Sequence, residues 1–595
     1  MAAAQETEPR HALKAICLLA VLVLAKAITL LQLHESVQWS VWAPVAYFWQ
    51  DVLVALVFFL LDASLKRHAI GWALYGVIVA YVAINVPVTV VLSSPLTWAL
   101  LRATGSALTD SIAHYLTATN VASLVLPVCA AVWLPWWLSR RRLAVGLPWV
   151  LSALVVVAFG PIASSRVETR GLHRNALGAL VETSLPRVTP IRGTADWRAS
   201  PFDASDGDDL SRFRGSLKGR NVVLVALEST AARYLGLYGA AQDPLPTLTA
   251  LSRHAIVFDR AYAVYPESIK GLFTTLCSRY PAFDTAPEIY EGVPCASLAS
   301  RLEDAGYHTA LFHSGRFEYL GMRSIIENRG FDLLEDAGTI GGQVNSSFGV
   351  DESSTVRRIL SWIDAMDRTR PFFVTYLPIA GHHPYPTTKS GPFKGAGDFS
   401  RYLNALREGD EALGELIRGL QARHFDQNTL FVVFGDHGEA FGQHPGNFAH
   451  TLSIYEENIR VPYVIAAPGA IESGVRVKRL ASLVDTAPTL LELLGLPLPP
   501  EYQGSSLLGP QSRMALFYTD YSRGWLGLAD ACWKYLFELD ARQSRLFDVC
   551  SDPDETRDRA AEFPERVAAY RDRAEKWAAA QKESVAQTRT PQREP

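Results

Sequence analysis

The sequence predicts an α/β protein in two parts, a polytopic helical membrane domain followed by a soluble domain with a mostly parallel central sheet. The long apolar runs lie before residue 165, whereas strand-like and helix-like runs alternate after about residue 195. At 595 residues the chain is also too long for one ordinary core. A formal net charge of -4 and the lack of a Lys/Arg-rich tract give no indication of nucleic-acid binding.

The membrane domain is expected to cover residues 1–163 with about five transmembrane helices, each near the ~20 residues that cross a bilayer. The expected spans are 12–33, 44–64, 70–92, 120–138 and 145–163. A lone signal peptide does not fit, because the first run is long, lacks a small-residue cleavage pattern and is followed by further spans. Lys26 falls within a span, where it is either functional or reaches towards an interface.

Basic residues in the short loops predict the orientation. They precede span one and lie between spans two and three and between spans four and five: Arg10, Lys14, Lys66, Arg67, Arg140, Arg141 and Arg142. The other loops carry only Arg102. The N-terminus is therefore expected in the cytoplasm, and an odd number of spans places the chain after residue 163 outside. The loop 96–118 has helically spaced apolar residues and is expected along the outer membrane surface.

The soluble part contains an even number of cysteines, as is common in oxidising compartments. Cys532 and Cys550 bracket a strand–turn–strand pattern whose antiparallel pairing would bring its ends together. We therefore expect one disulfide between Cys532 and Cys550 and another between Cys277 and Cys295, the alternative being four free thiols.

Residues 164–215 are expected to be a linker, 216–580 a catalytic domain and 581–595 a disordered tail. The strand-like runs include "NVVLVALEST", "HTALFHS", "PFFVTYLPIAGHH" and "TLFVVFGDHGE". In parallel sheets, active sites lie beyond the carboxyl ends of strands. The acids and imidazoles there are Glu228, His313, His382, His383, Asp436 and His437. The adjacent Asp436 and His437 suit a divalent metal, with Glu228 as a third ligand.

Several motifs occur together in a characteristic order: "NVVLVALES", "SRYP", "GHHPYP", "FGDHGEAFGQHP", "YEENIRVPYVI" and "SLVDTAPTLLELLGLP". The set resembles the sulfatase family of the alkaline phosphatase superfamily over residues 220 to 560. The preceding spans make the whole chain similar to its membrane-anchored branch, the lipoteichoic acid synthase-like and phosphoethanolamine transferase-like proteins. The resemblance implies an alkaline-phosphatase-like sandwich for the soluble domain.

The resemblance also implies a nucleophile eleven residues before Arg279, which is Ser268. Sulfatases convert this residue to formylglycine when Pro or Ala follows at +2 and Arg at +4. Here these positions hold Lys270 and Leu272, so the modification signature is missing. An unmodified serine can attack phosphorus. Phosphotransferases of the family usually use threonine, so Ser268 departs from their pattern.

The family pattern assigns Glu228, Ser268, Asp436 and His437 to one divalent metal, Mn, Zn or Mg, or Ca if the protein is a sulfatase. His450 is the candidate general acid. Lys270 is expected either to stabilise charge on the transferred group or to be simply solvated. His444 is expected at the surface or behind the site. The expected substrate-binding residues are His382, His383, His313, Arg316 and Arg323.

The expected activity is a metal-dependent phosphotransfer at a bacterial inner (plasma) membrane, with the catalytic domain periplasmic or extracellular. A phosphoglycerol- or phosphoethanolamine-type head group would pass from a lipid donor, through Ser268, to an envelope glycan or glycolipid. The alternatives are a sulfatase, a phosphodiesterase and a non-catalytic ectodomain.

Overall fold

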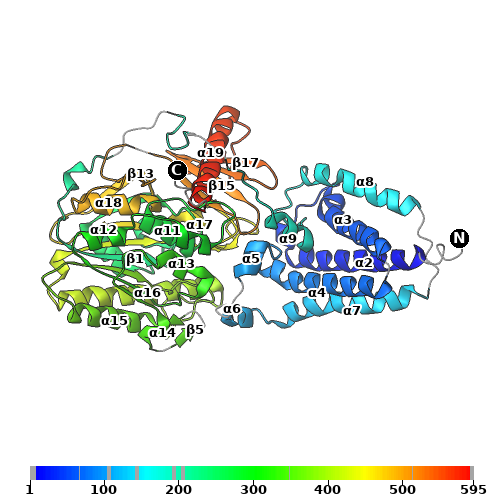
Figure 1. Cartoon of the computed structure of the whole chain (residues 1–595), viewed down its shortest axis with the longest axis horizontal. Helices are drawn as coiled ribbons and strands as arrows, with labels where there is room; N and C mark the ends of the chain where they lie inside the picture. Colours follow the sequence, from blue (N-terminus) through cyan, green and yellow to red (C-terminus); the bar gives the residue numbers. More distant parts are fainter. Residues whose placement is uncertain are drawn as a thin grey trace, which may run out of the picture.

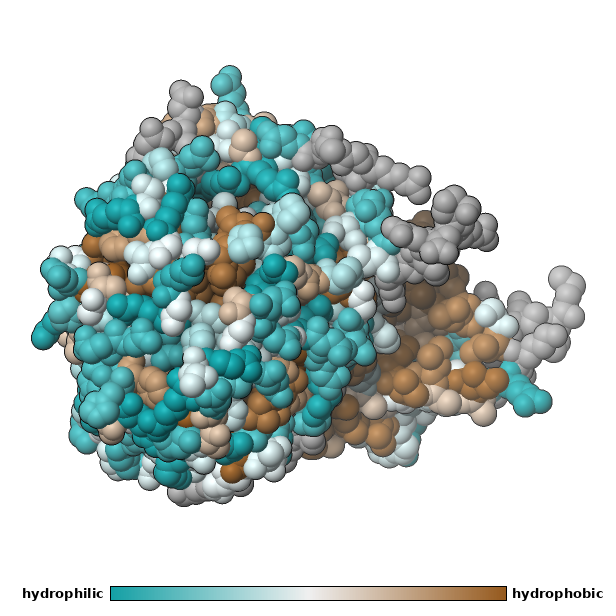
Figure 2. Space-filling model, turned by 60° about the vertical axis from the view of Figure 1, so that its left-hand side comes forward, coloured by the Kyte–Doolittle hydropathy of each residue, from teal (hydrophilic) through white to brown (hydrophobic). Residues whose placement is uncertain are grey.

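The computed structural model describes residues 8–65, 67–103, 109–140, 147–190, 196–202, 208–342, 344–346, 349–511 and 513–589. Lys66, Arg141 and Arg142, which contribute to the orientation argument, lie outside these ranges. A helical bundle and a larger α/β domain lie end to end (Figure 1). Apolar surface gathers over the bundle, whereas the α/β domain is mostly hydrophilic (Figure 2).

The described residues contain four helices long and apolar enough to cross a membrane. They lie in α2 (Glu8–Gln32), α3 (Ala43–Ser64), α4 (His68–Leu92) and α7 (Ala118–Leu138). The fifth expected span is α8 (Leu147–Ser164), a shorter apolar helix that packs along α3. The short helices α5 (Trp98–Ala103), α6 (Thr109–His114) and α9 (Ala176–Ser184) lie at the junction with the α/β domain (Figure 1).

Charged side chains inside the bundle are paired. Lys14 Nζ lies 2.5 Å from Asp62 Oδ1, and Lys26 Nζ lies 3.8 Å from Asp51 Oδ2. Lys26 also donates hydrogen bonds to the carbonyl oxygens of Leu172, at 3.1 Å, and Arg174, at 2.6 Å. Lys26 thus attaches α2 to the segment after α8, which gives it a structural role at the junction.

The α/β domain is built on a nine-stranded sheet with the order β11-β2-β12-β8-β1-β7-β3-β4, and β13 pairs with β2. Strands β8, β1, β7, β3 and β4 are parallel, as the alternation of elements predicts, whereas β11 and β12 run antiparallel to their neighbours. The strands are β1 (Asn221–Leu227), β2 (Ala255–Tyr262), β3 (His308–His313), β4 (Leu333–Glu335), β7 (Phe372–Leu377), β8 (Thr429–Gly435), β11 (Arg460–Val461), β12 (Tyr463–Ala466) and β13 (Val475–Ser482).

Helices cover both faces of this sheet (Figure 1). One face packs against α11 (Ser268–Cys277), α12 (Leu298–Asp304) and α18 (Thr486–Leu493). The other packs against α10 (Pro246–Leu251), α15 (Glu352–Ala365) and α16 (Asp398–Gln421). Residues of β1 alternate between the two cores, with Val222 and Leu224 in one and Val223 and Val225 in the other. This alternation explains why the strand is apolar throughout.

A second, four-stranded antiparallel sheet follows near the C-terminus. Its strands are β14 (Ala515–Thr519), β15 (Trp525–Asp530), β16 (Trp533–Glu538) and β17 (Gln543–Asp548). Helix α19 (Pro564–Arg589) packs against it, with Tyr570 and Trp577 fully buried. The strand–turn–strand expected between Cys532 and Cys550 is the β16–β17 hairpin.

The expectation of a disordered tail after residue 580 is wrong for residues 581–589, because α19 continues to Arg589. Gln581 and Val585 are buried on it, and Ser584 accepts a hydrogen bond from Arg279 at 2.7 Å. The segment expected as a linker also makes specific contacts. It contains α9, and Val188 and Trp197 are buried in the core beneath the second sheet.

Both predicted disulfides are present, Cys277–Cys295 and Cys532–Cys550. The first joins the end of α11 to the loop before α12, and the second closes the β16–β17 hairpin. The remaining cysteines, Cys17 and Cys129, are free and lie in membrane helices.

Candidate active site

Two neighbouring parallel strands place the acidic residues of the site side by side. In the β1–β8 register, Leu227 lies opposite Gly435, so Glu228 and Asp436 emerge together at the carboxyl edge of the sheet. The turn after β8 is close to its neighbours: a Cβ on Gly435 would lie 2.2 Å from the Thr230 carbonyl oxygen. Glycine is therefore required where the chain turns to present Asp436 and His437.

Ser268 is brought to these side chains by the start of α11. Glu267 caps the helix, accepting a hydrogen bond from the Ile269 N–H at 2.8 Å. The Ser268 hydroxyl lies 2.6 Å from Asp436 Oδ2 and 3.0 Å from Glu228 Oε2. His437 Nε2 lies 3.5 Å from the same oxygen. The four residues expected to bind one metal therefore converge in the structure.

The donor set fits a divalent cation. Glu228, Asp436 and His437 are buried, and their ligand atoms lie within 4.8 Å of one another. Among the described residues, no Lys or Arg lies within ion-pair distance of either carboxylate. Burial raises the pKa of Asp436 to about 7, and the charge of Glu228 adds to the shift while His437 opposes it. A small cavity of about 20 Å³ lined by Glu228, Ser268 and Asp436 is the size of a single ion or water.

The orientation of His437 supports the same assignment. Its Nδ1 lies 2.9 Å from the Gly438 carbonyl oxygen, which can only accept a hydrogen bond. The Nε2 atom therefore faces Glu228 Oε1 and Asp436 Oδ2, each at 3.6 Å. A backbone carbonyl on one ring nitrogen is a common way to direct the other nitrogen at a metal.

His450 lies against the site and is held by a buried acid. Its Nδ1 lies 2.7 Å from Glu439 Oε2, and its ring centroid is 4.3 Å from that of His437. Tyr385 donates a hydrogen bond to the other Glu439 oxygen at 2.9 Å. Burial raises the pKa of Glu439 to about 7 and holds that of His450 well below its usual value. The geometry suits a proton-transferring pair, and the general-acid role of His450 stays a prediction.

Two expected substrate-binding histidines also lie at the site. His382 has its ring centroid 6.3 Å from that of His450. His313 lines the small cavity, and its Nδ1 lies 3.0 Å from the Leu377 carbonyl oxygen. His383 instead stacks on Tyr115, with ring centroids 5.2 Å apart. The loop between α6 and α7 therefore reaches the edge of the site.

The three expected cationic side chains have different surroundings. Lys270 is buried and its Nζ lies 3.0 Å from Asp520 Oδ2, so the expectation of a solvated lysine is wrong. Arg316 lines a larger cavity beside the site. Arg323 is half exposed and pairs with Glu318 and Glu327, each at 3.1 Å, so its charge is already compensated at the surface.

His444 lies away from the Ser268 cluster. Its Nδ1 is 2.7 Å from Glu457 Oε1, and its ring stacks on Tyr455 with centroids 3.7 Å apart. Burial lowers the pKa of His444, but the hydrogen bond and the charge of Glu457 offset this effect and raise it above its usual value.

Three positions at the site are absent from the residues assigned from sequence. Glu439 belongs to the "FGDHGE" motif and Glu267 directly precedes Ser268, so motif position was an available signal for both. Asp520 follows β14 and is 250 residues from its partner Lys270. No local pattern links that pair.

The strand-end acids and the helix-borne serine form a metal-and-nucleophile site of the kind that enzymes use on phosphate or sulfate esters. The sulfatase family profile matches residues 220–496, and the C-terminal profile of N-sulphoglucosamine sulphohydrolase matches residues 446–566. Residues 220–496 therefore form a domain of the sulfatase family, in the alkaline phosphatase superfamily.

Individual relatives are named as a sulfatase or as a lipoteichoic acid synthase-like protein. Arylsulfatase K of Bos taurus is 27% identical over 460 residues, covering 62% of this chain and 83% of the relative. The lipoteichoic acid synthase-like protein YvgJ of Bacillus subtilis (strain 168) is 24% identical over 319 residues, covering 50% of this chain and 51% of the relative.

Among solved structures, the lipoteichoic acid synthase LtaP from Listeria monocytogenes matches with a TM-score of 0.50 and 17% identity. The match covers 65% of this chain and 97% of that structure. A protein solved in complex with its substrate D-glucosamine-2-N, 6-O-disulfate also matches with a TM-score of 0.50 and 17% identity, covering 63% and 100%. These similarities establish the fold.

Proposed function

We propose that the protein is a membrane-anchored, metal-dependent phosphotransferase that moves a phospho-head group from a lipid donor to an envelope glycan or glycolipid. The observation that carries the proposal is the position of the Ser268 hydroxyl, which lies at a helix N-terminus between two buried carboxylates. Such a hydroxyl can act as a nucleophile towards phosphorus without prior modification.

The surroundings of Ser268 favour an unmodified serine. The family's formylglycine signature requires Pro or Ala and Arg where this chain has Lys270 and Leu272. Both side chains are committed to the fold, since Lys270 is paired with Asp520 and Leu272 is buried in the core. This arrangement supports phosphotransfer over sulfate-ester hydrolysis.

The proposed transfer has two displacement steps. A divalent cation held by Glu228, Asp436 and His437 would lower the pKa of the serine hydroxyl and polarise the phosphoryl oxygens. Ser268 Oγ forms a bond to phosphorus as the bond to the lipid oxygen breaks. The hydroxyl proton has an acceptor, Asp436 Oδ2, at 2.6 Å. The pair of His450 and Glu439 supplies the proton that the leaving alcohol needs. In the second step, the oxygen of an acceptor alcohol forms a bond to phosphorus as the bond from Ser268 Oγ breaks. The alcohol proton returns to the pair of His450 and Glu439, and Ser268 regains the proton held at Asp436.

The membrane helices support a lipid donor, because tethering a catalytic domain to the bilayer raises the effective concentration of membrane substrates. We place the protein in a bacterial plasma membrane with the α/β domain on the outer side. This placement takes α8 as a fifth span, since an odd number of spans is needed to bring the α/β domain outside. The distribution of basic loop residues and the similarity to a lipoteichoic acid synthase-like protein of Bacillus subtilis support it.

A sulfatase is the second candidate. The observation that favours it is the longer match to arylsulfatase K, over 460 residues against 319 for the lipoteichoic acid synthase-like protein. It requires that Ser268 be oxidised to formylglycine despite the missing signature.

Peptide mass spectrometry of the purified full-length protein tests the two candidates. We expect an unmodified Ser268 peptide that gains a phosphoglycerol or phosphoethanolamine group after incubation with phosphatidylglycerol or phosphatidylethanolamine. The Ser268→Ala protein should show no adduct. A Ser268 peptide lighter by two hydrogens, with no lipid-derived adduct, would instead make the protein a sulfatase.

A further inference from the structure

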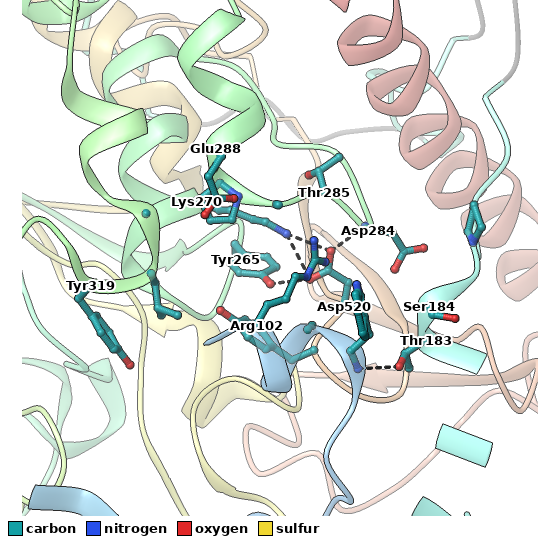
Figure 3. A pocket seen from close by; sticks show the side chains of 18 of the residues that line it. Arg102, Thr183, Ser184, Tyr265, Lys270, Asp284, Thr285, Glu288, Tyr319 and Asp520 are labelled. Carbon is teal, nitrogen blue, oxygen red and sulfur yellow. Dashed lines mark hydrogen bonds and ion pairs between the residues drawn. The ribbon is translucent and has the colours of Figure 1, made fainter. Parts of the chain in front are cut away.

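A second, larger cavity lies between the α/β domain and the short helices on the membrane side. It measures about 650 Å³, within the range of small-molecule binding sites. Its lining comes from α5 and α9 on one side and from the loops around Lys270, Tyr319 and Asp520 on the other. Figure 3 shows Lys270 reaching the cavity from α11 and Arg102 from α5, on opposite sides.

The cavity lies beside the Ser268 site. Lys270 in its wall is two residues after Ser268 on the same helix. Tyr319, also in its wall, has its ring centroid 6.3 Å from that of His382, which in turn neighbours His450. A molecule bound in the cavity can therefore extend towards the nucleophile.

The charge of the cavity is unbalanced once its ion pairs are counted. Asp520 is paired with Lys270, Asp284 with Arg187, and Glu318 with Arg323. Among the described residues, three cationic side chains in the wall have no carboxylate within ion-pair distance, against a single such acid, Glu288. The three are Arg102, Arg316 and Lys582. Such a surplus attracts a phosphate and repels an ammonium group.

The membrane side of the cavity carries exposed apolar side chains beside Arg102. Trp98 and Leu185 line it, and they are 41% and 60% exposed. Contacts with the α/β domain hold α5 in place: Thr97 Oγ1 donates to the Tyr521 carbonyl oxygen, and Ser94 Oγ lies 2.5 Å from Ser522 Oγ. The Trp98 N–H also donates to Thr183 at 2.9 Å, which joins α5 to α9.

We infer that this cavity binds the head group of a net-anionic phospholipid, with Arg102 as a residue that determines specificity and the acyl chains over Trp98 and Leu185. The inference rests on the proposed function and narrows it, because a phosphoglycerol-type donor fits the surplus of positive charge and a phosphoethanolamine-type donor does not. It also gives the loop between the third and fourth membrane helices a direct part in substrate recognition.

Binding to the full-length Ser268→Ala protein in detergent tests this inference without turnover. The probes are dihexanoyl phosphatidylglycerol, dihexanoyl phosphatidylethanolamine and glycerol phosphate, measured by isothermal titration calorimetry. We expect phosphatidylglycerol to bind about tenfold or more tightly than phosphatidylethanolamine, as expected for one charge-assisted contact. Adding Arg102→Gln should weaken phosphatidylglycerol binding by about tenfold and reduce this preference.

Arg166→Gln is the matched control, because Arg166 is an exposed membrane-side arginine outside the cavity. Leu185→Ser should weaken binding of the lipid but not of glycerol phosphate. The inference would be overturned if the two lipids bound equally well or if the two arginine variants had equal effects. It would also be overturned if phosphatidylglycerol and glycerol phosphate bound equally well. The mass adduct on Ser268 is measured separately, in the enzyme that keeps its serine. If that adduct does not form but the anionic lipid still binds, only the transfer reaction is rejected.

Discussion

At the scale of single residues, the site depends on side chains with several partners each. Asp436 accepts hydrogen bonds from the Ser229 and His437 N–H groups through Oδ1, which leaves Oδ2 for Ser268. Ser268 itself occupies the first turn of α11, where the helix dipole favours negative charge. The position of the hydroxyl is thus fixed by two strand ends and one helix end.

Glu228→Gln should remove bound metal, because it replaces a charged ligand with a neutral one in a cluster of two carboxylates and one imidazole. We expect metal affinity to fall by about 100-fold or more, since changes even to groups behind metal ligands cost 10- to 100-fold. Metal content is measured by inductively coupled plasma mass spectrometry after dialysis. His254→Asn, at an exposed histidine outside the candidate metal clusters of the described residues, is the control and should retain the metal.

Glu439→Gln tests whether Glu439 positions His450. The change keeps the size of the side chain but removes the carboxylate that lies 2.7 Å from His450 Nδ1. We expect kcat to fall by about 100-fold, the lower range for general acid–base catalysis, with KM and metal content unchanged. Tyr385→Phe removes one contact to the same carboxylate and should have a smaller effect. An unchanged kcat in Glu439→Gln would show that His450 needs no such support.

At the scale of elements, α11 carries the nucleophile at one end and a disulfide at the other. Cys277 ends the helix and is joined to Cys295, while Ser278 takes a left-handed conformation with φ of 48°. The helix is buried against the main sheet, so its position relative to β1 and β8 is set by packing as well as by the covalent bond.

The two disulfides span equal lengths of chain, which makes them a matched pair for stability measurements. Each joins cysteines 18 residues apart, and closing such a loop stabilises a fold by about 3 kcal/mol in the chain-entropy view. Replacing Cys277 and Cys295 with serine should lower the thermal midpoint more than replacing Cys532 and Cys550. The reason is that Cys277 is buried, whereas Cys550 is exposed. Equal shifts in differential scanning fluorimetry would contradict this order.

At the scale of the whole molecule, the membrane bundle and the α/β domain share a polar junction. Arg187 pairs with Asp284 at 2.7 Å and donates to the Ser522 carbonyl oxygen at 2.7 Å. Arg545 pairs with Glu168 at 3.0 Å, just after α8. The first contact holds the segment after α9, and the second holds the segment after α8, so the bundle is fixed against the α/β domain beside the cavity.

The junction should weaken in acid because of His173. Burial, together with the charges of Lys26 and Arg174, lowers the pKa of His173 to about 3. A histidine with a lowered pKa in the folded state contributes stability above its unfolded pKa of 6.5, and this is lost as the pH falls from 6.5 towards 3.

Thermal midpoints of the full-length protein and of His173→Gln, measured from pH 7 to pH 4.5, check this expectation. As the pH falls, the thermal midpoint of His173→Gln should rise relative to that of the unchanged protein. Parallel curves for the two proteins would show that His173 does not titrate in this range.

The sequence by itself determined the division into membrane and soluble parts, the parallel strands and the residues at their ends. It also predicted both disulfides and the Ser268 cluster. The spans and strands follow from local periodicity, which each stretch of chain carries alone. The Ser268 cluster follows from motifs whose order and spacing resemble a known family. The sequence did not determine that α19 continues past residue 580, because the burial of Gln581 and Val585 depends on distant partners.

Only the tertiary structure decided which cations have partners. Lys270 pairs with an acid 250 residues away, Arg323 is compensated at the surface, and Arg102 comes from a membrane loop to a cavity of the α/β domain. Ion pairs and cavities form between surfaces that meet only after folding, and the energy of a charge depends on what lies within a few ångströms of it.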